Sequence, residues 1–200
     1  MPFELETLTR AKVASVNLRS ERHGPQDLVP AVDVRLQIET PNDILTAFDG
    51  WLKTALYHRA AGQDPQPALE GMAQSDAPNL RFPKLAAPLR WDAEHTGHTL
   101  TIDRGLGGRS NIVLAECKVG KFQIEPKEGG TVVVSFSVSS SAELSEKVLG
   151  KLGQLVQHDV LIELHGPEPE GEDLAGKMPA PPAETPKPKD ATDAFVDANT

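Results

Sequence analysis

Strict alternation of apolar and polar residues marks two segments of the chain as strands. In residues 31–40 the apolar side chains all fall on one face, whereas the other face carries charged and amide groups. Residues 131–139 show the stronger pattern, with Val134 and Phe136 at its centre. A period of two with one polar face is typical of a half-buried strand. Weaker alternation predicts further strands at 12–18, 98–103, 111–117, 121–125 and 160–164.

Two other segments carry apolar residues at spacings of three and four, which predicts amphipathic helices. The first covers residues 43–56, where Asn42 or Asp43 can cap the first turn and Gly50 weakens the middle. The second covers residues 142–157 and contains two glycines, which make it a poor helix in isolation. Between them, residues 61–79 contain several prolines and predict a surface loop.

The predicted order is two strands, a helix, four strands, a second helix and a final strand. Short turns between consecutive strands, such as residues 126–130, favour antiparallel pairing. We therefore expect a mainly β (α+β) domain over residues 1–165. A curved antiparallel sheet or an open OB-like barrel with two packed helices fits this order, and a plain α+β sandwich fits it equally.

The charge of the chain is concentrated at its C-terminal end. Of the formal charge of −9, residues 166–200 contribute −5, because they hold eight acidic and three basic residues. This Pro-rich segment is poor in aromatic residues, so we expect a disordered acidic tail. Phe195 lies among acidic residues there, and two interpretations remain open: docking to a protein partner, or a segment that only confers solubility.

The sequence lacks the characteristic features of several classes of protein. No run of 18 apolar residues is present, so we expect no transmembrane helix. The acidic N-terminus lacks the apolar core of a signal peptide, which predicts a cytoplasmic protein. Cys117 is the single cysteine, so an intramolecular disulfide is excluded.

Candidate catalytic and metal-binding residues are few, and each has a simpler structural explanation. Asp92, His95 and His98 contain zinc-ligand side chains, but residues three apart on a regular strand project to opposite faces. Cys117 lies among apolar strand residues and is expected to be a small core residue rather than a nucleophile. The glycines at 105–108 lack the Lys-Ser/Thr ending of a phosphate loop and predict a β-turn. We therefore expect no enzyme, no metal and no cofactor.

Basic residues form two groups in the sequence despite the acidic balance. The first two strands and their connection carry one group, and the hairpin around the glycine loop carries the other, with Phe122 as a ring that could stack on a base. The candidate nucleic-acid-binding residues are Arg19, Arg22, Arg35, Arg104, Arg109, Lys118, Lys121 and Phe122. The alternative is that these are ordinary solvated side chains, because the domain has no basic excess.

Three stretches resemble small proteins from the replication and recombination regions of tailed bacteriophages. They are residues 19–34, residues 42–57, and residues 80–108 with their Leu-Thr-Ile-Asp-Arg-Gly-Leu-Gly-Gly segment. The chain is also similar in plan to phage single-stranded-DNA-binding proteins, which join a β-rich body to an acidic tail containing a phenylalanine. It differs from them in that Phe195 lies five residues before the end.

The resemblance implies a non-enzymatic phage protein that binds single-stranded DNA during replication or recombination in the bacterial cytoplasm. Phage or host replication proteins would then be partners of the acidic tail. Two alternatives stay open. One is a protein-binding module that inhibits a host nuclease or defence complex, and the other is a small virion or assembly protein.

Removal of residues 166–200 should leave the fold intact, because the tail contains no predicted core residue. A chain that ends at His165 is expected to melt within a few degrees of the full-length protein in a calorimetric scan. A large fall in the melting temperature would show that the tail packs on the body.

Overall fold

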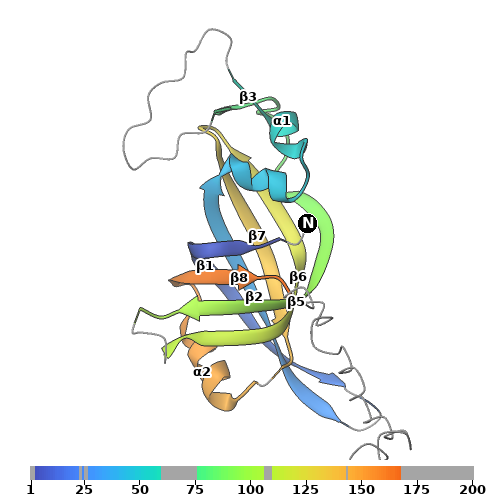
Figure 1. The fold of residues 1–200 in the computed structure, drawn as a ribbon, viewed down its shortest axis with the longest axis vertical. Coiled ribbons are helices and arrows are strands. Elements are labelled where there is room, and N and C mark those ends of the chain that lie inside the picture. The colour runs from blue at the N-terminus through green and yellow to red at the C-terminus, as the bar shows by residue number, and fades with distance from the viewer. Residues whose placement is uncertain are drawn as a thin grey trace, which may run out of the picture. The chain divides into compact units, whose positions relative to one another are not determined.

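The computed structural model describes residues 3–22, 24, 27–59, 76–105, 110–142 and 144–167 (Figure 1). The predicted tail and Phe195 lie outside the described residues, as do most of the predicted surface loop and Arg109. The contacts of the chain divide it after Pro167. The elements are β1 (Leu5–Arg22), β2 (Leu28–Pro41), η1 (Asn42–Ala47), α1 (Leu52–Leu56), β3 (Tyr57–His58), β4 (Asn79–Leu80), β5 (Leu89–Asp103), β6 (Ile112–Lys127), β7 (Thr131–Ser140), α2 (Glu146–Gln154) and β8 (Asp159–His165).

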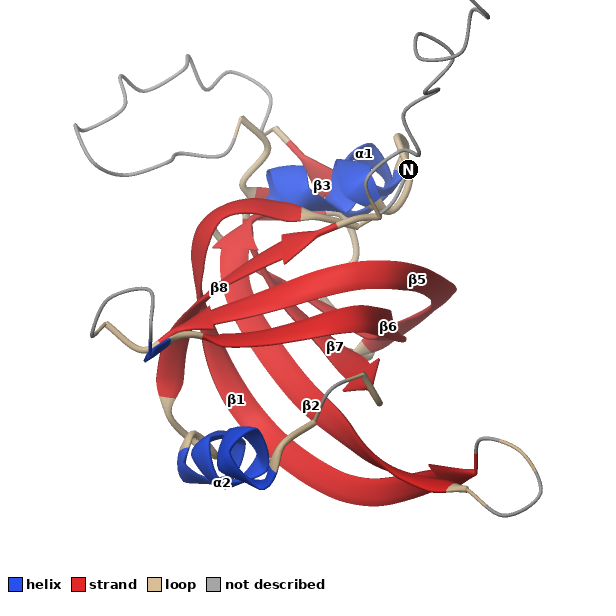
Figure 2. Ribbon diagram, turned by 60° about the horizontal axis from the view of Figure 1, so that its bottom comes forward, coloured by secondary structure: helices blue, strands red, loops and turns tan. Residues whose placement is uncertain are grey.

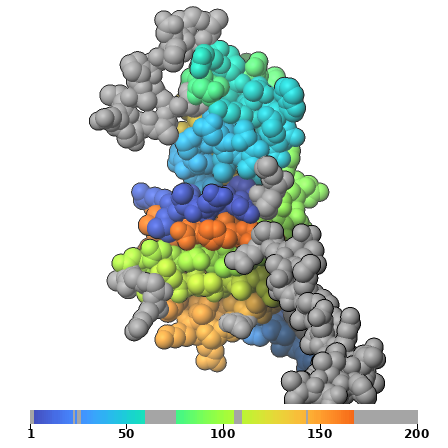
Figure 3. Space-filling model, in the orientation of Figure 1, coloured from blue at the N-terminus to red at the C-terminus, as the bar shows by residue number. Residues whose placement is uncertain are grey.

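Six antiparallel strands close into a barrel in the order β1-β2-β7-β6-β5-β8. The β1–β2 hairpin and the β5–β6–β7 meander join where β2 pairs with β7. The short strand β8 closes the ring, because it pairs with β5 on one side and with β1 on the other. In the space-filling view β1 and β8 lie side by side across the molecule (Figure 3).

The predicted curved antiparallel sheet is therefore confirmed, and the sheet closes on itself. An OB barrel has five strands, whereas this ring has six, so the number of strands does not match that of an OB barrel. The predicted strands at 31–40, 131–139 and 160–164 correspond to β2, β7 and β8. The first strand is much longer than predicted, because β1 runs from Leu5 to Arg22.

The two strands predicted at 111–117 and 121–125 are a single strand, β6, and that prediction was wrong. Along β6 the buried positions switch twice between even and odd residue numbers. The buried pairs are Ile112 and Leu114, then Cys117 and Val119, then Phe122 and Ile124. Residues with positive φ lie at both changes, Glu116 at 49° and Lys121 at 54°. The pairing register also shifts next to Lys121. Each irregularity is a β-bulge, which inserts one residue and returns apolar side chains to the inner face.

The barrel interior is an apolar core to which every long strand contributes. Phe3, Phe122 and Phe136 meet in edge-to-face and tilted contacts, with ring centroids 5.1–6.0 Å apart. Val134 and Phe136 are fully buried, which confirms the strand register predicted from alternation. Such aromatic contacts contribute beyond the area that they bury.

Short helical segments close the two ends of the barrel (Figure 2). The first predicted helix is instead a 3-10 turn, η1, followed by the five-residue helix α1, and Gly50 lies between them. Asn42 does not cap this segment, because its side-chain amide donates to the Ala77 carbonyl at 2.9 Å. The second predicted helix is shortened to α2, where the Ser145 hydroxyl accepts from the Val148 amide at 3.3 Å. None of the helices in the described part of the chain is long and apolar enough to cross a bilayer.

Truncation of the Phe136 side chain should destabilise the barrel strongly. Phe136→Ala leaves a cavity at the centre of the aromatic cluster, and we expect a loss of about 3–5 kcal/mol of unfolding free energy. Val113→Ala is the matched control, because Val113 lies exposed on the outer face of β6. Urea midpoints that fall equally for both variants would contradict this assignment of the core.

Candidate binding groove

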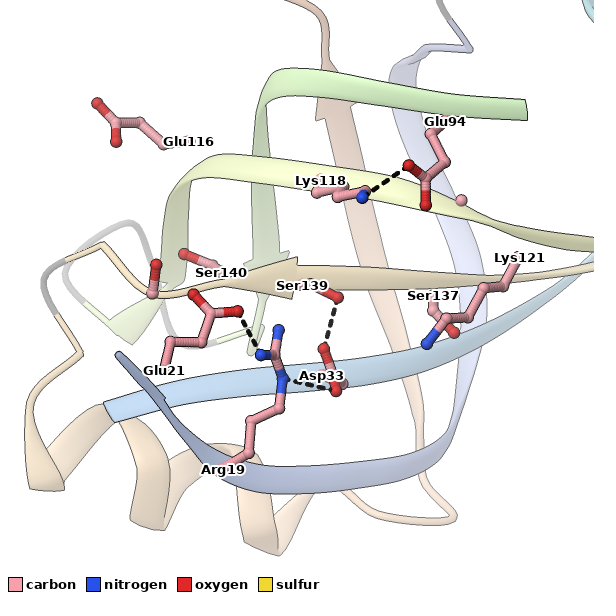
Figure 4. A pocket seen from close by; sticks show the side chains of 12 residues that line it. Arg19, Glu21, Asp33, Glu94, Glu116, Lys118, Lys121, Ser137, Ser139 and Ser140 are labelled. Atoms are coloured by element: carbon pink, nitrogen blue, oxygen red, sulfur yellow. Dashed lines mark hydrogen bonds and ion pairs between the residues drawn. The ribbon is translucent and has the colours of Figure 1, made fainter. Parts of the chain in front are cut away.

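A polar groove crosses the outer face of the barrel where β1, β2, β7 and β6 lie next to one another (Figure 4). Its volume is about 440 Å³. The groove is lined by the charged residues Arg19, Glu21, Asp33, Glu94, Glu116, Lys118 and Lys121, by Ser137, Ser139, Ser140 and Ser141, and by Gly120. Three cations therefore face four carboxylates, so the groove is polar without a basic excess.

The bulge at Lys121 places two lysines on the same outer surface. Lys118 and Lys121 are three residues apart, a spacing that puts side chains on opposite faces of a regular strand. The extra residue between Gly120 and Gln123 restores the outward direction of Lys121 and turns Phe122 inward. Re-aiming a side chain is a common role of bulges near functional sites.

Most of the charged side chains in the groove are held in ion pairs. Arg19 contacts Glu21, and its Nε donates to the Asp33 carboxylate at 2.9 Å. Lys118 pairs with Glu94 at 2.6 Å, and the Ser139 hydroxyl donates to Asp33 at 2.5 Å. Burial raises the pKa of Asp33, but the bonds from Ser139 and Arg19 outweigh it, so the pKa lies below its usual value. A carboxylate of such low basicity is a poor general base.

Two cations beside each other differ from the rest of the groove. Among the described residues neither Arg35 nor Lys121 forms an ion pair with a carboxylate, although the charge of Lys121 contributes to the lowered pKa of Asp33. The Arg35 guanidinium donates to the Lys121 carbonyl at 3.3 Å, to the Ser137 hydroxyl at 3.3 Å and to the Gln123 side chain at 2.6 Å. Lys121 and Ser137 lie at one end of the groove (Figure 4). This end combines positive charge with a hydroxyl, the two kinds of donor that hold a phosphate oxygen.

The structure places some of the predicted cations in or beside the groove and the others elsewhere. Arg19, Lys118 and Lys121 line the groove, and Arg35 lies beside it. Arg22 is exposed at the end of β1. Arg104 lines a different hollow with Arg10 and His158. Arg104 therefore does not line the groove with the lysines, and Arg109 lies outside the described residues.

Phe122 does not offer a ring for base stacking, so this prediction was wrong. Its side chain is 1% exposed, and its ring contacts Phe3, Phe48 and Phe136 in the core. The cause is the bulge at Lys121, which sequence spacing alone did not reveal.

The serines of the groove were missed at the sequence level. Ser137 and Ser139 alternate with buried apolar residues on β7, and Ser140 and Ser141 follow. On the outer face of the second half of β7, the side chains of Ser135, Ser137 and Ser139 are small hydroxyl groups, which leave room for a ligand and supply donors. The available signal was the five serines among residues 135–141.

His95 and His98 lie closer together than their spacing on a regular strand allows. A register shift between them, with Gly97 at φ +77°, turns both rings toward the same side, and their centroids are 5.8 Å apart. His98 is buried, and its Nε2 lies 3.2 Å from the Phe3 carbonyl oxygen. Across the described ranges no group of three or more His, Cys, Asp or Glu side chains is placed to hold a metal ion.

The remaining sequence candidates are explained by packing and turn geometry. Cys117 is fully buried, and its thiol donates to the Leu114 carbonyl at 3.2 Å. Gly105 adopts a φ of +70°, and its amide donates to the Asp103 carboxylate at 2.9 Å. Residues 106–109 of that glycine loop lie outside the described residues.

The chain matches no known family model, no curated protein and no solved structure. The groove itself therefore carries the functional argument. Among the described residues, Arg35 and Lys121 form no ion pair with a carboxylate, and the Ser137 hydroxyl lies beside them.

Cys117 should behave as a protected thiol. Burial raises its pKa to about 11, from 9.0 in the unfolded chain. A raised pKa stabilises the folded state below pH 9.0, and this contribution is lost as the pH rises from there through the folded pKa. We expect native protein to react with a thiol reagent far more slowly than urea-unfolded protein. Cys117→Ala is the control for reagent specificity, and equal native and unfolded rates would contradict the assignment.

Proposed function

We propose that this protein binds single-stranded DNA without catalysing a reaction, along the groove on the outer face of β1, β2, β7 and β6. The observation that carries the proposal is the pair of cations, Arg35 and Lys121, that flank Ser137 and form no ion pair with a carboxylate in the described part of the chain. The setting that we propose is phage replication or recombination in the cytoplasm of a bacterial host, on the resemblance in plan noted above.

The groove suits a flexible phosphate backbone better than a folded duplex. Hydroxyl and ammonium donors distributed along the neighbouring strands can contact successive phosphates of an extended strand without reading its sequence. In the absence of DNA, Arg19 and Lys118 are held by Glu21, Asp33 and Glu94. Binding then exchanges carboxylates for phosphates at these positions, which lowers the net gain and predicts moderate affinity.

Fluorescence anisotropy with a labelled single strand of about 30–40 nucleotides tests the proposal directly. Affinity should fall with salt, with a logarithmic slope of about −0.7 for each phosphate contacted. The Lys121→Glu variant should weaken binding about five- to tenfold at low salt and make the slope shallower. The effect should be alike for different sequences, because phosphate contacts carry no base information.

Lys12→Glu is the matched control, because Lys12 is exposed on β1 outside the groove and the charge change is the same. Asp33→Asn should strengthen binding, since it removes a carboxylate that competes for Arg19. Absence of salt-sensitive binding at low ionic strength, or equal losses in both lysine variants, would overturn the proposal.

A protein-binding module is the second candidate, and exposed aromatic side chains at one end of the barrel favour it. Trp51 is 80% exposed, and Phe82 is 59% exposed beside a small apolar cavity of about 60 Å³ that Leu56 and Leu89 also line. Aromatic side chains are enriched at protein interfaces. Under this alternative the target would be a host nuclease, a defence complex or a virion component. Capture of such a protein that Trp51→Ser and Phe82→Ser abolish, with no DNA binding, would favour it.

A further inference from the structure

The outer edge of β1 loses its strand partner halfway along the strand. Pairing with β8 ends at Lys12 opposite Asp159. The next backbone groups are met by the segment after α2: the Val13 amide donates to the His158 carbonyl at 3.0 Å, and the Gln157 side chain donates to the Ala14 carbonyl at 2.8 Å. From Ser15 to Arg22 no strand pairs with this edge among the described residues.

This edge is regular enough to accept another strand. Beyond Ser15 the pairing of β1 with β2 continues without a shift to Arg22 opposite Leu28. The hairpin projects past the rest of the sheet and away from α2 (Figure 2). An unpaired row of amides and carbonyls on a flat strand is a template for pairing with a further chain.

Three other unpaired edges in the described part of the barrel are irregular. The edge of β5 before Thr99 contains three register shifts and the positive-φ residue Gly97. The edge of β2 before Val32 contains Pro30, which has no amide hydrogen. The edge of β6 before Lys118 contains the bulge at Glu116. Bulges and proline are the usual protection of an edge against pairing, and β1 lacks both between Ser15 and Arg22.

The face of this hairpin that continues the inner surface of the barrel carries exposed apolar side chains next to Ser20 and Arg22. Leu18 lies opposite Val32, and Leu28 lies opposite Arg22, on the same face. Leu18 is 60% exposed, and Leu28 is also exposed. Pairing at the β1 edge would therefore bury apolar side chains in addition to satisfying backbone groups.

We propose that the free edge of β1 pairs antiparallel with the same edge of a second copy of this chain, with the twofold axis at Leu18. This register pairs seven of the eight residues of the free edge, from Ser15 to Glu21, and sets Leu18 against Leu18. Arg19 then faces Asn17, and Glu21 faces Ser15, so no like charges lie directly opposite. A twofold axis at Arg19 or Glu21 would oppose like charges, which destabilises a pair of strands.

The charges near the axis are compatible with this register. Arg19 already contacts Glu21 and Asp33 of its own chain, so its charge is largely compensated before a second copy approaches. Axes at Asn17 or Ser20 avoid like charges too, but each leaves a shorter ladder between Ser15 and Arg22. The longest ladder and the apolar contact coincide only at Leu18.

Cysteine substitution at the axis gives the sharpest test. Directly opposed residues of antiparallel strands have Cα atoms about 4.5–5.5 Å apart, within the range that a disulfide spans. Leu18→Cys in the full-length chain should form a disulfide-linked dimer under mild oxidation. Leu161→Cys is the matched control, because Leu161 is 40% exposed but lies on β8, where it is paired with β1 on one side and with β5 on the other. The buried Cys117 should not cross-link in either variant.

Sedimentation of the unmodified chain and of Leu18→Lys, without nucleic acid, supplies the second measurement. We expect a concentration-dependent dimer whose dissociation constant rises at least about tenfold in Leu18→Lys, since like charges then meet at the axis. A monomer at every concentration, or equal cross-linking of Leu18→Cys and Leu161→Cys, would overturn the inference. Leu18 does not line the groove, so failure of the dimer leaves the DNA proposal standing, and the reverse also holds.

Discussion

A closed sheet has a single interior, and this constraint governs the rest of the structure. Each strand must keep its apolar side chains on the inner face along its whole length, although β5 and β6 are long and the barrel is narrow. Simple alternation does not keep the apolar side chains of β6 on the inner face over its full length. Two bulges, at Glu116 and Lys121, return them to that face. The same device turns His95 and His98 to one side in β5. The core of phenylalanine rings and the polar outer surface both follow from these corrections.

The groove is a consequence of the bulge in β6 as much as of its own residues. The bulge brings Lys121 to the outer face next to Arg35 of β2 and Ser137 of β7. Elsewhere in the groove each cation is close to a carboxylate, which keeps the surface near neutrality and stabilises the face when no ligand is bound. If the groove binds an anion as proposed, the anion must displace these carboxylates, so we expect moderate affinity and salt dependence.

The ring is closed over only part of the length of its strands, because β8 has seven residues and β1 has eighteen. The excess length of β1 and β2 leaves the barrel as a hairpin with one regular, unpaired edge. The groove lies on the outer face of the same two strands, where Arg19 and Asp33 meet. Pairing of two such hairpins would place two grooves on one continuous sheet, without using any side chain of the groove as a contact at the axis.

The sequence by itself determined the elements whose apolar pattern is unbroken. Alternation located β2, β7 and β8 and put Val134 and Phe136 in the core, because strand periodicity is a local property of the backbone. It also indicated that Arg19, Arg35, Lys118 and Lys121 are candidates for one surface. Only the tertiary structure decided where alternation breaks, since a bulge is fixed by the partner strand and by closure of the ring. Closure of the ring placed Phe122 inside, placed Arg104 in a different hollow from the lysines, and paired Arg19 and Lys118 with carboxylates of neighbouring strands.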